Sequence, residues 1–289
     1  MATRKELRVL VATDGSQDAR AAIATMLNFP WPAKTRVRVI SARRTAAEYR
    51  RSILLSALDR GAEQAVESAR RTLSRRWPDV ETAVVDKAPT QAIIDEAERF
   101  RADVTVVGWR GHGAVRRLLM GSVSRGVVRG STCAVLVVRR SQRVRTMVVG
   151  FDGSPTAKRA LAFVGRLAAP RDGRVTLVHA AELMPIPSGL VPGAAAVARE
   201  VRRQNTVRAR TAMKGLERAA AGLTRGGWHP STVVLHGEPL RDLLGAVAAS
   251  RAHLLVVGAR GTSGIRRLLL GSVAEGALNR SPVSVLVVR

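Results

Sequence analysis

The sequence predicts an α/β protein of two repeated, doubly wound domains, each a five-stranded parallel sheet in the order 3-2-1-4-5 flanked by helices. Two observations carry this prediction. The 289-residue chain repeats itself from end to end, and each copy contains five short, valine-rich apolar runs separated by longer segments with helical spacing. Nearly continuous apolar strands are typical of parallel sheets that crossover helices cover on both faces.

The repeat divides the chain into two expected domains, residues 1–141 and residues 142–289. LRVLVATDGS (Leu7 to Ser16) corresponds to RTMVVGFDGS (Arg145 to Ser154), and the later apolar runs pair in the same way. Each half is long enough to bury a core of its own.

The two copies differ in length in one region. Between Ala180 and Thr232 the second copy carries 12 residues that the first copy lacks. We expect them in the Pro- and Gly-rich run MPIPSGLVPG, residues 184–193.

The expected elements of the first copy follow in chain order. Strands are predicted where apolar residues run nearly unbroken, at Leu7–Thr13, Thr35–Ser41, Thr82–Asp86, Val104–Gly108 and Ala134–Val138. Helices are predicted in the segments with helical spacing, at Gln17–Asn28, Ala47–Arg75, Pro89–Phe100 and Ser122–Arg129. This order leaves a topological switch between the first and fourth strands, where ligands of such folds bind.

Composition places the protein among soluble globular chains. Apolar residues make up 46% of the sequence, and no run of 18 or more apolar residues occurs. The opening residues lack a signal-peptide core, and one cysteine, Cys133, cannot form an intramolecular disulfide. We therefore expect a cytoplasmic protein without a membrane partner.

The charge is strongly positive. Lys and Arg number 48 against 22 Asp and Glu, a net charge of +26 spread over both halves. Such a field attracts nucleic acid and other polyanions. An aromatic content of 3% and the absence of a recognition motif argue against a dedicated nucleic-acid module. Genomic base composition explains the arginine excess equally well, so non-specific polyanion binding stays an alternative.

A glycine-punctuated connection follows the fourth strand of each copy. VVGWRGHGAVRRLLMGS (residues 106–122) and VVGARGTSGIRRLLLGS (residues 256–272) agree at 11 of 17 positions and share the spacing G-x2-G-x9-G-S. Glycine permits positive φ and close approach of an anion, and a helix start offers free N–H groups to phosphate. No Walker A motif occurs.

These connections are predicted to cradle a polyphosphate, although a tight turn alone would also explain the glycines. Two full copies in the same context favour the cradle. Arg110 and Arg260, like the adjacent arginine pairs 116–117 and 266–267, either contact the anion or point into water. The candidate residues are Gly108, Arg110, Gly111, Gly113, Gly121, Ser122, Val123 and Ser124, with Gly258, Arg260, Gly261, Gly264, Gly271, Ser272 and Val273 in the copy.

An aspartate faces each connection across the switch. Asp14 and Asp152 follow the first strand of each copy in an Asp-Gly-Ser sequence. A carboxylate there can accept a ribose hydroxyl or hold Mg²⁺ beside phosphates. Asp-Gly-Ser is also favourable turn chemistry, so a purely structural role stays open.

At these residues the chain resembles the universal stress protein family in its tandem, ATP-binding form. The resemblance spans both halves and rests on G-x2-G-x9-G-S and on the Val-x2-Asp-Gly-Ser starts at residues 11–16 and 149–154. It implies ATP phosphates on the glycine connections and Asp14 or Asp152 near ribose, phosphate or Mg²⁺. It also implies pairing of the last strands of the two halves as an internal pseudo-dimer, and leaves a homodimer open. It implies contacts to the base from Ala12, Thr13, Ala42, Gly150, Phe151 and Ala180.

The copies differ in ways that predict unequal pockets. Phe151 stands where the first copy has Thr13, and its bulk is expected to alter the fit of the base. Trp109, which replaces the copy's Ala259, is expected to do the same in the first pocket.

No catalytic constellation stands out, because the five histidines are scattered without metal-ligand spacing. The leading hypothesis is an ATP-binding stress-response protein that acts by binding rather than turnover. A slow Mg²⁺-dependent ATPase or phosphoryl-transfer enzyme is the alternative, followed by a basic polyanion-binding protein.

Overall fold

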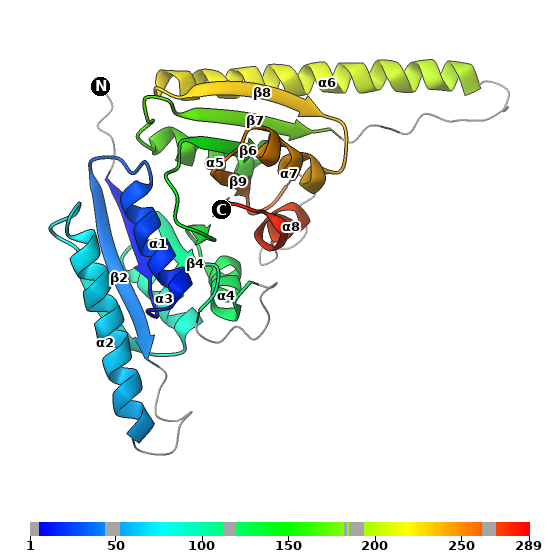
Figure 1. Ribbon diagram of the computed structural model, residues 1–289. Coiled ribbons are helices and arrows are strands. Elements are labelled where there is room, and N and C mark those ends of the chain that lie inside the picture. The colour runs from blue at the N-terminus through cyan, green and yellow to red at the C-terminus, as the bar shows by residue number, and fades with distance from the viewer. Residues whose placement is uncertain (1–5, 44–52, 112–119, 182–183, 185–193, 262–269) are drawn as a thin grey trace.

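The chain forms one continuous, strongly twisted sheet with helices on both faces (Figure 1). The computed structural model describes residues 6–43, 53–111, 120–181, 184, 194–261 and 270–289. Two elongated helices, α2 in the first half and α6 in the second, run in different directions because the sheet twists between the halves (Figure 1).

Strands and helices alternate in the first half. They are β1 (Leu7–Ala12), α1 (Gln17–Asn28), β2 (Thr35–Arg43), α2 (Ile53–Leu73), β3 (Glu81–Asp86), α3 (Pro89–Arg99), β4 (Val104–Gly108), α4 (Ser122–Gly130) and β5 (Ala134–Val138). The predicted bounds agree with these to within two residues. The exception is the predicted start of the second helix at Ala47, which lies outside the described residues.

The second half repeats the order. Its elements are β6 (Thr146–Gly150), α5 (Pro155–Arg166), β7 (Arg174–Ala180), α6 (Ala194–Arg225), β8 (His229–Leu235), α7 (Pro239–Ala249), β9 (Leu254–Gly258), α8 (Ser272–Arg280) and β10 (Ser284–Val288). The prediction of a repeated, doubly wound α/β fold is confirmed.

The ten strands are ordered β3-β2-β1-β4-β5-β10-β9-β6-β7-β8. Within each half the neighbours are parallel and the order is the predicted 3-2-1-4-5. The halves meet through β5 and β10, which pair antiparallel with Leu136 opposite Leu286. The expected pairing of the last strands within one chain is therefore present.

Two apolar layers cover the sheet. One face packs against α1, α2, α5 and α6, and the other against α3, α4, α7 and α8. Each layer is continuous from one half to the other, because the antiparallel seam keeps equivalent helices on the same side. Within the first half, α1 follows β1 and packs on one face, whereas α4 follows β4 and packs on the other. The switch between these two strands is open for this reason.

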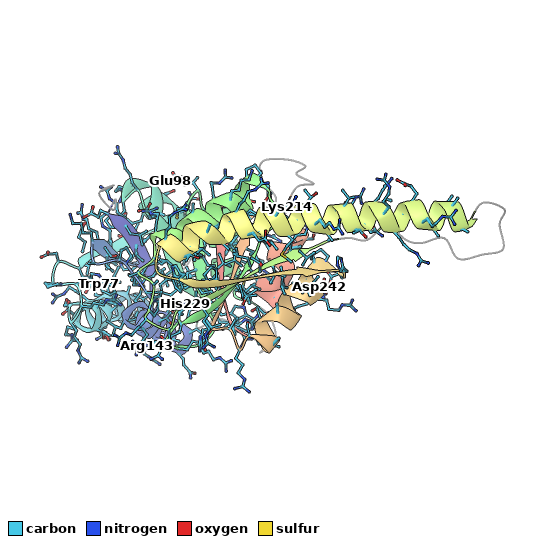
Figure 2. The ribbon with its side chains drawn as sticks, turned by 90° about the horizontal axis from the view of Figure 1, so that it is seen from above. Trp77, Glu98, Arg143, Lys214, His229 and Asp242 are labelled. Carbon is cyan, nitrogen blue, oxygen red and sulfur yellow. The ribbon has the colours of Figure 1, made fainter. Side chains whose placement is uncertain are left out.

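The extra residues of the second half lie between β7 and β8. Their predicted site, residues 184–193, lies outside the described residues except for Met184, so this expectation stays a prediction. Helix α6 has 32 residues, and the part of α2 that the structure describes has 21. The N-terminal part of α6 projects beyond the sheet and carries exposed Val197 and Val207 (Figure 2).

In the part of the chain that the structure describes, we find no helix of the length and apolarity needed to span a bilayer.

A buried carboxylate ties β2 to α3. Glu96 is 2% exposed and accepts hydrogen bonds from Arg38 at 2.5 Å and from Arg99 at 2.7 Å. Arg38 also pairs with Glu81, and this bond, more than the burial that opposes it, lowers the pKa of Glu81. The network holds α3 on the face of the sheet that also carries α4.

We predict that Arg38→Met lowers the free energy of unfolding by about 3 kcal/mol, because it weakens the pairing of a buried carboxylate. Arg36→Met is the control: Arg36 also pairs with Glu81, but it is 49% exposed against 22% for Arg38 and pairs with the 32% exposed Glu81 instead of the buried Glu96, so the loss should stay below about 1 kcal/mol. Urea titrations measure both. Folding lowers the pKa of Glu81 from 4.5, so the stabilisation that Glu81 gives to the fold is present above that pH and is lost on acidification. The difference in free energy of unfolding between Arg38→Met and wild type should therefore become smaller below pH 4.5. A difference that widens there would contradict this assignment.

Candidate functional site

The predicted site residues gather at the carboxyl ends of β1 and β4 in the first half and of β6 and β9 in the second. We call the connection after β4 the first glycine loop (residues 108–122) and its copy after β9 the second glycine loop (residues 258–272). Residues 112–119 and 262–269 lie outside the described residues, and with them Gly113, Gly264 and both arginine pairs. The flanks of both loops are described.

A tight turn carries each aspartate. Gly15 and Gly153 have φ of 78° and 79°, a conformation that glycine adopts without strain. The backbone N–H of Ser16 donates to Asp14 Oδ1 at 3.0 Å, and Asp152 makes the equivalent contact with Ser154 at 3.0 Å. One oxygen of each carboxylate thus closes the turn, as the structural interpretation of Asp-Gly-Ser expects.

The other carboxylate oxygen faces the glycine loop. A Cβ added to Gly261 would lie 2.9 Å from Asp152 Oδ2, and one added to Gly111 would collide with Asp14 Oδ2. A side chain at either position would therefore have to displace the carboxylate. The turn and the loop face each other across the switch in both halves.

Each loop is closed at its base by the backbone. The N–H of Gly121 donates to the carbonyl of Trp109 at 3.0 Å, and Gly271 repeats this contact with Ala259 at 2.8 Å. The strand end is also fixed, because the N–H of Trp109 donates to Val138 O at 2.8 Å. The two ends of an otherwise long connection are held together where helix α4 or α8 begins.

The first glycine of each loop lies against a helix start on the opposite face. A Cβ on Gly108 would be 2.7 Å from the backbone carbon of Asp18, and one on Gly258 would be 2.6 Å from Thr156 Oγ1. Ser16 and Ser154 cap these helices, α1 and α5, through the N–H groups of Ala19 and Ala157. Close helix–strand packing explains this glycine.

Helices α4 and α8 present their N-termini to the switch. Gly121 and Gly271 occupy the N-cap positions and provide no side-chain cap. The first N–H groups of a helix have no partner within the helix, and they carry the positive end of its dipole. Ser122 and Ser272 are exposed at this point. The hydroxyl of Ser124 is buried and donates to Gly108 O at 2.6 Å, which leaves its backbone N–H as the group at the helix start.

The residues expected at the base lie on both faces of the sheet. Ala12 and Ala42 are half-buried and pack on the face that carries α3 and α4, as Val123 does. Gly150 lies on the equivalent face, since a Cβ there would be 3.3 Å from Leu243 of α7. Ala180 ends β7 and is also half-buried.

Phe151 packs on the other face of the sheet, with the apolar layer that includes α5 and α6. Its carbonyl contacts His179 Nδ1 at 2.9 Å, and its N–H donates to Val178 O at 2.8 Å. Thr13 is buried at the equivalent position, with its N–H on Ile40 O at 2.9 Å. The bulk of Phe151 is thus directed into the core, away from the face on which Gly150 lies.

The expectation for Trp109 is wrong. Its ring is buried at the seam between the halves, where Nε1 donates to Leu278 O at 3.3 Å. The guanidinium carbons of Arg110 and Arg139 lie 4.0 Å and 3.8 Å from the ring centroid. Trp109 therefore belongs to the contact with α8 rather than to the base end of the switch. The sequence offers no signal for this beyond the unmatched Ala259 in the copy.

Basic groups border both turns. Arg20 donates to Gly15 O at 2.7 Å, and half-buried Arg110 and Arg260 follow the glycines of the two loops. The carbonyl of Arg260 accepts from Thr156, which ties the second loop to α5. Among the described residues we find no cluster of three His, Cys, Asp or Glu able to hold a metal ion, so any Mg²⁺ would need further ligands from a bound phosphate.

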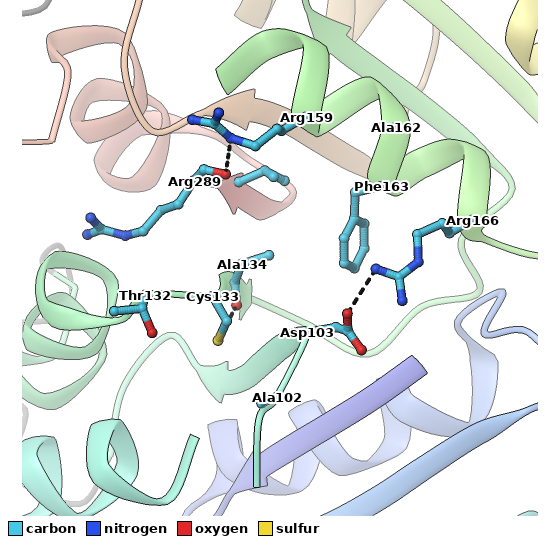
Figure 3. Close-up of a pocket in the computed structure, with 11 residues that line it drawn as sticks. Ala102, Asp103, Thr132, Cys133, Ala134, Arg159, Ala162, Phe163, Arg166 and Arg289 are labelled. Carbon is cyan, nitrogen blue, oxygen red and sulfur yellow. Dashed lines mark hydrogen bonds and ion pairs between the residues drawn. The ribbon is translucent and has the colours of Figure 1, made fainter. Parts of the chain in front are cut away.

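A hollow lies between the halves, at the amino ends of β4 and β5 and the carboxyl end of β10 (Figure 3). It is a cleft of about 390 Å³ bordered by the start of β4, the start of β5 and helix α5. Arg166 pairs there with Asp103 at 2.9 Å, and Arg159 donates to Arg289 O at 2.6 Å (Figure 3). Because Ala102 and Asp103 precede β4 whereas the first glycine loop follows it, this cleft is distinct from the first predicted site. On the side of the second half it lies at the carboxyl end of β10, where Val288 pairs with Gly258 at the start of the second glycine loop.

Comparisons with known proteins agree with the repeat. A model of the universal stress protein family matches residues 7–139 and again residues 143–289. A universal stress protein of Mycobacterium tuberculosis H37Rv is 30% identical over 306 residues, which cover 99% of this chain and 98% of that protein. One from Thermus aquaticus is 32% identical over 146 residues, 50% of this chain and 98% of its own. The crystal structure of a universal stress protein from Archaeoglobus fulgidus DSM 4304 has a TM-score of 0.66 at 18% identity and covers 98% of each chain, which shows a shared fold.

We predict that Gly108→Ala lowers the free energy of unfolding by about 1–3 kcal/mol, because its Cβ must displace the first turn of α1. Gly245→Ala in α7 is the matched control: a Cβ there meets nothing within 4 Å, so helix propensity should raise stability by about 0.5–1 kcal/mol. Chemical denaturation compares the two. Equal effects of both substitutions would refute the close approach of β4 to α1.

Proposed function

Because the chain belongs to the universal stress protein family, we propose that it binds ATP at two sites, one in each half, and acts in a stress response by binding rather than by turnover. The observation that carries this proposal is the doubled arrangement at the switch. In each half a helix start, a glycine loop closed at its base and an aspartate face one another. If the glycines only formed a tight turn, there would be no reason for a helix start without a side-chain cap to face the same aspartate and glycine loop.

The phosphates are assigned to the helix starts. The N–H groups of Ser122, Val123 and Ser124, and those at Ser272 and Val273, supply donors together with a favourable dipole. Glycine at 111 and 261 lets each loop pass close to its aspartate, and glycine at 121 and 271 lets each helix start pack closely on the base of its loop. Arg110 and Arg260 add positive charge beside it.

Ribose and base are assigned to the strand ends. Asp14 and Asp152 keep one oxygen toward the loop and can accept a ribose hydroxyl or approach a phosphate-bound Mg²⁺. Backbone groups at Ala12, Ala42, Gly150 and Ala180 border the adenine. Since Phe151 packs into the core, its bulk is compatible with a base in the second pocket, and we propose that both sites bind.

We predict that Ser122→Glu abolishes binding at the first site and Ser272→Glu at the second. A carboxylate at the first helical position repels phosphate, which lowers affinity by at least about tenfold, yet it favours the helix dipole and keeps the fold stable. Isothermal titration with ATP should give two equivalents for wild type, one for each single variant and none for the double variant. Ser68→Glu, on the exposed face of α2, makes the same charge change and should retain two.

The net charge of +26 makes a salt control necessary. Binding to a general basic surface would weaken equally in all variants as salt rises, whereas loop binding should depend on residues 122 and 272 at every salt concentration. If the double variant still bound two equivalents, or wild type bound none, the proposed sites would be rejected.

A slow Mg²⁺-dependent ATPase or phosphoryl-transfer activity is the second candidate, motivated by the carboxylate oxygens that face the loops. If Asp14 and Asp152 hold a phosphate-bound Mg²⁺, phosphate release should survive stringent purification, require Mg²⁺ and fall at least about tenfold in Asp14→Asn with Asp152→Asn. Release of labelled phosphate measures it. Under the leading proposal we expect no turnover above the double variant, so a clear difference would favour the enzyme.

A further inference from the structure

Two equivalent arginines cross the seam between the halves. Arg139 directly follows β5 and Arg289 directly follows β10. Because these strands pair antiparallel, the residue after each strand reaches the other half. Each arginine ends at the C-terminus of the helix that follows the opposite glycine loop.

The contacts match on both sides. Arg139 Nη2 donates to the carbonyls of Leu278 and Asn279 in α8, at 3.0 and 2.9 Å. Arg289 Nη2 donates to the carbonyls of Val128 and Arg129 in α4, at 2.6 Å each. The last carbonyls of a helix lack partners within it and carry the negative end of the dipole, so a guanidinium there satisfies both the hydrogen bonds and the charge.

The two capped helices are the ones whose N-termini face the switch. Each has nine residues, about two and a half turns, and acts as one rigid unit. At its start, the N–H of Gly121 or Gly271 is held by the base of its own loop. Its other end is held by the arginine of the opposite half.

Both arginines are half-buried, and their position carries a cost in free energy. The Nε atoms of both have no hydrogen-bond partner among the described residues, although they are shielded from solvent. Burial, and then the nearby charges of Arg110 and Arg260 respectively, lower the pKa of Arg139 and Arg289. An apolar side chain would fill this seam at a lower cost in desolvation free energy. The presence of a guanidinium group at both positions therefore points to a role in positioning the helices.

We propose that each phosphate site is positioned by the other half of the chain: Arg139 holds α8 for the second site, and Arg289 holds α4 for the first. The inference rests on the proposed function, since it concerns the same two sites. Neither arginine touches the nucleotide in this arrangement. Loss of either arginine makes the C-terminal end of the helix more mobile. The N–H groups at the N-terminal end of that helix are then held less firmly at the phosphate site.

The two sides are not equally secured. Leu278 O accepts from Trp109 as well as from Arg139, whereas the position of Trp109 is taken by Ala259 in the second half. The ion pair of Arg129 with Glu275 at 2.7 Å joins α4 to α8 and serves both helices, so after removal of Arg139 helix α8 keeps this pair and the Trp109 donor, whereas after removal of Arg289 helix α4 keeps, among the described residues, the ion pair alone. The proposal therefore requires a larger effect from Arg289 than from Arg139.

The experiment uses the full chain with one site blocked at a time. Ser122→Glu leaves the second site as the reporter, and Ser272→Glu leaves the first. Into each background we would introduce Arg139→Met or Arg289→Met, which keep an apolar stem in the seam, and measure ATP affinity by isothermal titration. Arg140→Met, at an exposed neighbouring position, is the matched loss of charge.

The expected pattern is crossed. Arg139→Met should weaken only the second site and Arg289→Met only the first, by about fivefold, the factor that corresponds to ~1 kcal/mol, with the larger effect from Arg289→Met. Arg140→Met should change neither. Weakening at the same-side site would overturn the proposal, because Arg139 stacks on Trp109 of its own loop and could act there instead. No effect at either site would overturn it too.

Hydrogen exchange without nucleotide separates this proposal from the previous one. The amides of the last turn of α8 should exchange faster in Arg139→Met, and those of α4 in Arg289→Met, while the opposite helix stays unchanged. If wild type binds no ATP but the crossed exchange is seen, the nucleotide assignment fails and the anchoring stands. If ATP binds at both sites and exchange is unchanged or uncrossed, the anchoring fails alone.

Discussion

The antiparallel pairing of β5 with β10 is the contact on which the rest of the structure depends. It joins two five-stranded sheets into one and keeps equivalent helices on the same face, so both apolar layers run without a break through the whole chain. It also directs the residues after each strand into the opposite half. The seam, Trp109 and the two crossing arginines all follow from this one register.

The same physical logic fixes the switch in both halves. Close packing of Gly108 and Gly258 against a helix start brings the β1 and β4 connections together, and likewise those of β6 and β9. The Asp-Gly-Ser turn satisfies its own backbone with one carboxylate oxygen and leaves the other toward the loop. The turn thus uses one oxygen of the Asp14 carboxylate, and the proposed ligand contact concerns the oxygen on the side of the loop.

The strands and most helix bounds were predictable from the periodicity of apolar residues along the chain. The meeting of Asp14 with Gly111 was predictable from the strand order, which brings the ends of β1 and β4 together. The destination of Trp109 was not predictable, since it depends on a strand pair separated by about half the chain. The caps formed by Arg139 and Arg289 were missed for the same reason, because each contact depends on the pairing of β5 with β10.

The strand order has a consequence for growth of the sheet. With β5 and β10 joined, the free borders are β3 and β8. Pro230 in β8 has no N–H to offer an incoming strand, and β3 begins and ends with the charged residues Glu81 and Asp86. A proline and charged residues at a border disfavour the addition of another strand, and both borders of the ten-stranded sheet, as far as the structure describes the chain, carry such features. Because the two halves are covalently linked, this sheet forms within one chain, whereas two separate halves would form it only by association.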